Sequence, residues 1–106
     1  MTDQTSQSGK IDDKFYDRAD AHIHLSNDQA ADAPHEMVSA SLLFAAARYS
    51  AFISARGFST GESMAARRQE TIDYFVGGFR QMLEGNLDAY INNFDAYMKP
   101  NAGDAG

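Results

Sequence analysis

The sequence contains no cysteine among its 106 residues. It therefore forms no disulfide, has no thiolate nucleophile, and offers no sulfur ligand to zinc or to an iron–sulfur cluster. The first ten residues are polar, and no uninterrupted apolar run reaches the roughly 18 residues of a membrane span. We therefore expect neither a secretory signal nor a membrane segment, and a cytoplasmic location.

Positive charge is also scarce. Lysine and arginine number 9 against 15 aspartates and glutamates, which gives a formal net charge of −6. Such a surface repels phosphate backbones and anionic lipid heads, so we expect no nucleic-acid or membrane partner. The hydrophobic fraction of 43% is typical of a globular protein, and a chain of this length forms one domain.

The two ends of the chain lack apolar residues that a core would bury. We expect residues 1–10 and 99–106 to be disordered tails around a single helical domain at residues 11–98. The first helix is expected at about residues 12–31, begun by a cap from Asp12 or Asp13. One side of it is apolar, with Phe15, Ala19, His22, Ile23 and Ser26. The opposite side, called the acidic face below, carries Asp17, Asp20, His24 and Asp28.

The second helix is expected from near Pro34 to Gly57, because proline suits a first turn and glycine suits the residue after a helix. Its apolar residues surround the helix almost completely. One face holds Val38, Leu42, Ala46, Tyr49 and Ile53. The opposite one, called the Phe44 face below, holds Ala40, Phe44, Ala47, Ala51 and Ala55.

The third helix is expected to start after Ser59 or Thr60 and to run to Met98. Apolar residues recur along it at spacings of three and four, and they do not lose phase at Gly85-Asn86. We therefore favour a kinked continuation there over a clean split. This apolar stripe consists of Ile72, Phe75, Val76, Phe79, Leu83, Leu87, Tyr90, Phe94 and Tyr97. Gly77-Gly78 lies within it, which indicates either a closely approaching backbone or a weak helix.

The predicted fold is all-α, an antiparallel bundle of three long helices assembled as a homodimer. Three helices cover one broad side of the second helix but leave the Phe44 face open to water. A second copy would bury that face, and its alanines form a shallow groove that a partner's aromatic side chains can fill. The alternative is that residues 87–98 fold back to cover it within one chain.

Candidate ligand-binding residues are few. The acidic face has the spacing to share a divalent cation, although a solvated helix face explains it more simply. His22 on the apolar side is expected to be a satisfied histidine at the margin of the core. Arg48 stands between Phe44 and Phe52 in an apolar stretch, so we expect it to pair with a carboxylate of another helix or subunit; the alternative is an anion site. We find no catalytic residue, cofactor motif or phosphate-binding loop, and expect no enzyme activity.

Several segments together carry a family resemblance: Phe15 to Asp20, Val38 to Phe52, Ile72 to Phe75 and Met82 to Met98. They resemble a family of small bacterial proteins catalogued as a domain of unknown function, DUF3144. The block around Arg48 is the most specific part. Two positions differ from the family's pattern: His22, where a larger apolar residue is expected, and Gly77-Gly78, where helix formers are expected. The resemblance implies no catalytic residue, cofactor or substrate.

The composition and patterning favour a non-enzymatic, oligomeric helical module that binds another protein, as yet unidentified, through its acidic face or its third helix. The alternative is a protein that binds a small anion or a divalent metal ion through Arg48 or the acidic face.

Overall fold

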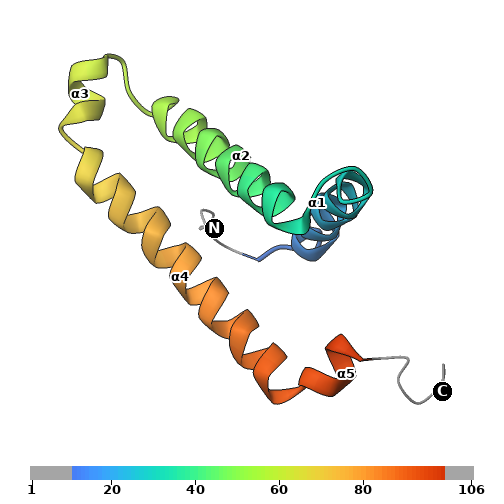
Figure 1. Cartoon of the computed structure of the whole chain (residues 1–106). Helices are drawn as coiled ribbons and strands as arrows, with labels where there is room; N and C mark the ends of the chain where they lie inside the picture. Colours follow the sequence, from blue (N-terminus) through green and yellow to red (C-terminus); the bar gives the residue numbers. More distant parts are fainter. Residues whose placement is uncertain (1–10, 100–106) are drawn as a thin grey trace. The chain divides into compact units, whose positions relative to one another are not determined.

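The computed structural model describes residues 11–99, which contain five α-helices and no strand. They are α1 (Phe15–Gln29), α2 (His35–Ala55), α3 (Gly61–Ala65), α4 (Arg68–Asn92) and α5 (Phe94–Met98), labelled in Figure 1. The all-α fold class is therefore confirmed. The predicted tails, residues 1–10 and 100–106, lie outside the described residues, whereas Lys99 is described and exposed. The chain divides into two compact units that meet between Gly61 and Glu62.

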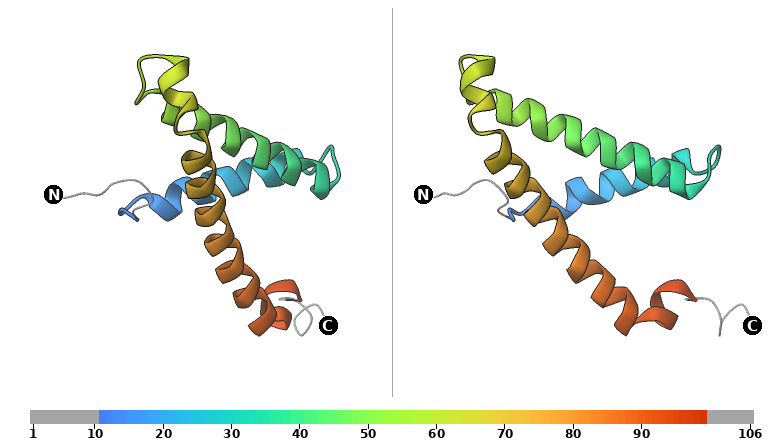
Figure 2. Two further views of the ribbon diagram at one scale, coloured as in Figure 1. Left: turned by 90° about the vertical axis from the view of Figure 1, so that its left-hand side faces the viewer. Right: turned by 60° about the vertical axis from the view of Figure 1, so that its left-hand side comes forward.

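The first unit contains α1 and α2, which contact one another. Figure 2 shows the two helices meeting at the short turn that joins them and diverging from it. Near this turn Ala30 and Ala33 are half-buried, and Val38 is the only described hydrophobic residue that is fully buried, at 7% exposure. Leu42, one turn further along α2, is half-buried. Val38 and Leu42 belong to the face of α2 that was expected to pack inward, so the choice of face is right at this end of the helix.

The start of α1 differs from the sequence expectation. Lys14 occupies the N-cap position, and no side chain caps the helix there. Asp12 contributes its backbone carbonyl to the turn, which accepts the Phe15 amide at 3.1 Å. Its carboxylate is instead hydrogen-bonded by the Arg18 guanidinium at 2.8 Å. The acid is used for an ion pair that spans the first turn, so the cap predicted at Asp12 or Asp13 is wrong.

Helix α2 begins and ends close to the predicted residues. Pro34 is the N-cap residue, with φ −59° and ψ 145°, and its carbonyl accepts the amides of Met37 and Val38. Gly57 lies just past the end, and its amide donates to the Ser54 carbonyl at 3.1 Å. Among residues 11–99, α2 is the one helix long and apolar enough to cross a membrane by length and composition. The core helix of a soluble protein meets the same criteria.

The predicted third long helix is divided into three. It breaks first at Ala66-Arg67, where the Arg67 amide turns back to the Met64 carbonyl and the Arg67 guanidinium bonds Glu70 at 2.7 Å. The expectation of three long helices is therefore wrong: α3 is a single five-residue turn of helix, separate from α4. An arginine that pairs three residues ahead stabilises the new helix start, a local contact that the apolar periodicity does not reveal.

The second break falls at Asn93, a position that the sequence did not indicate. Helix α4 runs without interruption through Gly85-Asn86 and ends at Asn92, and Asn93 leaves helical geometry with φ −127° and ψ 32°. The continuation through Gly85-Asn86 that the sequence favoured over a split is therefore observed. Figure 1 shows α5 turning away at the end of α4, with which it is in contact. Both helices belong to the second unit, so this arrangement is local.

Candidate interaction surface

The Phe44 face of α2 is open to solvent in the described chain. Phe44 is 66% exposed, its neighbour Met37 is 64% exposed, and the four alanines of this face are exposed as well. Because alanine side chains are small, the face is a shallow surface from which the Phe44 ring projects. The structure places all five predicted interface residues on one side of a single 21-residue helix. They form a continuous apolar surface on which another helix can pack.

Arg48 projects from α2 between two exposed aromatic residues, Phe44 and Phe52, and is itself exposed. Among residues 11–99, no carboxylate lies within salt-bridge distance of it. The ion pair expected for Arg48 is therefore absent from the described part of the chain. A pair with a carboxylate of a second copy stays a prediction.

The acidic face of α1 keeps its four residues on one side of the helix, all of them exposed. Across residues 11–99 the structure brings together no group of three or more His, Asp or Glu side chains that could hold a metal ion. His22, expected at the margin of the core, is also exposed. Neither the acidic face nor His22 is buried as residues of a ligand site within one chain usually are.

The carboxyl of Asp12 is paired, although the sequence did not single this residue out as paired. The hydrogen bond from the Arg18 guanidinium lowers the pKa of the Asp12 carboxyl from its usual value. Both side chains are about 60% exposed, so water screens the pair. The contact orders the start of α1.

A second apolar surface lies where α4 ends and α5 begins. It consists of the last four residues of the apolar stripe, called the distal patch below: Leu87, Tyr90, Phe94 and Tyr97, all about half exposed. The break at Asn93 brings Tyr97 onto Tyr90 in an edge-to-face contact with ring centroids 4.9 Å apart. The Lys99 ammonium lies 5.8 Å from the centre of the Phe94 ring. These contacts hold three aromatic rings at one end of the second unit.

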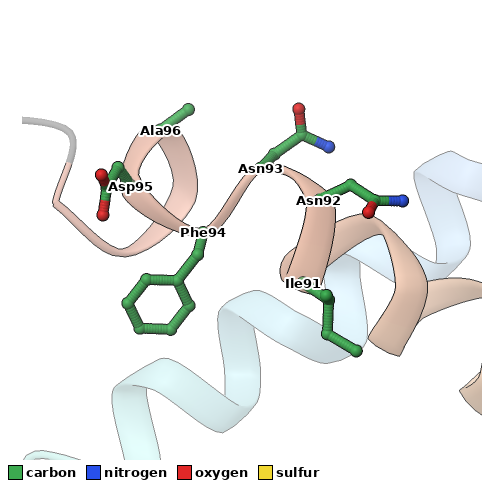
Figure 3. Close-up of a pocket in the computed structure, with 6 residues that line it drawn as sticks. All are labelled: Ile91, Asn92, Asn93, Phe94, Asp95 and Ala96. Atoms are coloured by element: carbon green, nitrogen blue, oxygen red, sulfur yellow. The ribbon is translucent and has the colours of Figure 1, made fainter.

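A shallow, open hollow marks the same break, and its walls come entirely from residues 91–96 (Figure 3). In the close-up the Asn92 and Asn93 side chains point away from the Phe94 ring. The Asn93 side-chain amide donates to the Ala89 carbonyl at 2.9 Å, which occupies it at the end of α4. A hollow formed by six consecutive residues encloses no ligand, so the apolar surface beside it is the feature of interest.

Sequence reasoning placed the residues of the distal patch on the stripe but did not identify them as a separate surface. The sequence feature that could have indicated this surface is the dense run of aromatic residues after Leu87, because these rings make up most of the patch. The position of the break itself has no signal in the apolar spacing, because that spacing continues in phase to Tyr97.

Comparison with known proteins identifies the family. The family model described as "Protein of unknown function (DUF3144)" matches residues 15–91. The chain belongs to this family. The resemblance inferred from the sequence is thereby confirmed, and the function of the family is unknown. No curated protein matches the chain.

A solved structure supports the fold. The NMR structure of the protein NB7890A from a Shewanella species is 38% identical to this chain. It superposes with a TM-score of 0.70, over 85% of this chain and 96% of that one. This DUF3144 chain therefore shares its helical fold with an experimentally determined relative.

Proposed function

We propose that this chain is a non-enzymatic helical interaction module that works as a homo-oligomer, with the Phe44 face of α2 as its interface. The observation that carries the proposal is the exposure of this face: Phe44 and Met37 are each about two-thirds exposed on a helix whose opposite face holds the buried Val38. The homodimeric, antiparallel bundle expected from the sequence is part of the same proposal.

The energetic reason for association is the apolar surface of α2 that would otherwise stay exposed to water. Burying apolar surface is worth roughly 25 cal/mol per Å², and contiguous exposed apolar surface of more than a few hundred Å² marks interaction sites on soluble proteins. Within the described chain, 23 large apolar side chains are more than a third exposed. Association with a second copy is the most economical way to cover the part of this surface that lies on α2.

The test is the molar mass in solution, measured by light scattering coupled to gel filtration over a wide range of concentrations. Phe44→Lys is expected to lower the mass to that of a single chain at concentrations where the wild type is a dimer or larger. Tyr49→Lys is the matched control, because Tyr49 has the same 66% exposure but lies on the opposite face of α2. A wild type that stays a monomer at every concentration would refute the proposal.

The alternative function, binding of a small anion or a divalent ion at Arg48 or the acidic face, is tested by thermal shift against a panel of metal ions and metabolites. A ligand that binds only the native state raises the melting temperature. A clear increase with one compound, lost in Arg48→Met or in a variant of the acidic face, would favour this alternative.

A further inference from the structure

The apolar stripe of α4 and α5 is longer than any other helix among residues 11–99. Helix α4 has 25 residues, about 37 Å, and α5 continues the stripe beyond its end, whereas α2 has 21 residues, about 31 Å. Whichever helix among residues 11–99 packs along the stripe, some of it is left over. Residues 56–67 connect the start of α4 to α2, and the distal patch lies at the opposite end of α4 from this connection.

The distal patch and the Phe44 face are complementary in shape, because large side chains project from the first and small side chains line the second. The patch presents three aromatic rings and a leucine, all about half exposed. The Phe44 face presents four alanines and one ring. Large side chains fit into the shallow surface over a row of alanines, and the helix backbones then approach closely.

The area also agrees with a stable assembly. Aromatic side chains have about 150–250 Å² of surface, so the four half-exposed side chains of the distal patch offer about 350 Å². The Phe44 face contributes a similar area, so one contact buries about 700 Å². A two-fold axis repeats the contact, which brings the total to about 1,400 Å². Stable protein interfaces bury about 1,200–2,000 Å².

We infer that the distal patch of one copy occupies the Phe44 face of α2 in a second copy, and that a two-fold axis repeats the contact. The inference rests on the proposed function and names what fills the interface. Under two-fold symmetry each chain gives one patch and receives one, so the assembly closes as a dimer and leaves neither surface open.

Disulfide trapping tests the pairing directly, because the chain contains no cysteine of its own. Two full-length variants, Ala51→Cys and Leu87→Cys, are made with different masses, mixed, allowed to exchange and oxidised. A disulfide forms only where the two Cβ atoms come within about 4.5 Å. The expected product is a covalent pair of one Ala51→Cys chain and one Leu87→Cys chain, in several-fold excess over the control mixture.

The control replaces Leu87→Cys with Asp88→Cys, the next residue, which is about 100° further round α4. Dichroism checks that each variant is helical, and Tyr90→Cys serves as a second probe of the patch if Leu87→Cys is not. Equal cross-linking of the patch and control cysteines would overturn the inference. So would an Ala51→Cys/Leu87→Cys double variant that closes its disulfide within one chain.

Wild-type molar mass separates the two proposals. If the wild type is an oligomer and no patch-to-face disulfide forms, the inference fails and the proposed function stands. A wild type that is always monomeric removes both.

Discussion

The glycines inside α4 give a quantitative test of how open this helix is. Gly77, Gly78 and Gly85 lie in the helix interior, and a Cβ added at any of them meets nothing within 4 Å in the structure. Nor does any of the three have the positive φ that favours glycine. Alanine therefore fits each position without a clash. Each substitution removes the helix-propensity penalty of glycine, which is about 1 kcal/mol of stability.

Each single variant should then raise the free energy of unfolding by about 1 kcal/mol, and the triple variant by about 3 kcal/mol. For a domain of this size, 1 kcal/mol corresponds to roughly 4–8 °C in the melting temperature. The assay is thermal and urea unfolding followed by dichroism at a fixed chain concentration, with the molar mass measured beside it. Gly61→Ala is the control: it also meets no neighbour but begins the five-residue α3, so we expect a change below about 0.5 kcal/mol.

A loss of stability at Gly77, Gly78 or Gly85 would refute this reasoning. It would mean that another segment of backbone approaches the glycine closely, which for Gly77-Gly78 was one of the two explanations the sequence left open. A loss that disappears on dilution to the monomer would place that backbone in a second copy.

Three further predictions follow from the charged residues. The Asp12 carboxyl should titrate below its usual pKa, and the Arg18→Met substitution should raise that pKa, which NMR titration measures. Because the pKa is lowered in the folded chain, the ion pair gives a small stabilisation above the unfolded-state pKa. This stabilisation disappears as the pH falls through the folded-state pKa. Chelator should leave the melting temperature unchanged, since the acidic face is expected to be solvated; a decrease of several degrees that one divalent ion reverses would contradict this. In urea titrations of dilute protein, where the exposed Arg48 side chain has no ion pair, Arg48→Met should change the free energy of unfolding by less than about 1 kcal/mol. At protein concentrations where the chain is assembled, the change should be larger. Equal changes at both concentrations would argue against a carboxylate from a second copy.

The sequence predicted the features that depend on helical periodicity. The all-α class, the extent of α2, the inward-facing Val38 and the continuity of the stripe through Gly85-Asn86 all follow from spacings of three and four. Features that depend on single local contacts were missed. The Arg18–Asp12 pair joins residues six apart, outside the usual spacings of three and four for helical ion pairs, and the turn at Arg67 depends on a bond to Glu70.

Two asparagines show why the break between α4 and α5 was not predicted from the sequence. Asn86 and Asn93 lie seven residues apart, and each donates its side-chain amide to the carbonyl four residues before it, at 2.8 and 2.9 Å. The same bond is present where α4 continues and where it stops, so the asparagine itself does not decide the outcome. What differs is the chain that follows: after Asn86 come Leu87 and Tyr90 on the regular stripe, whereas after Asn93 the ring of Tyr97 reaches back onto Tyr90. We infer that this ring contact stabilises the broken geometry after Asn93. Tyr97→Ala should therefore lengthen α4 past Asn93, which NMR chemical shifts of residues 92–96 would show as helical values; a break that persists in this variant would locate its cause in the asparagine after all.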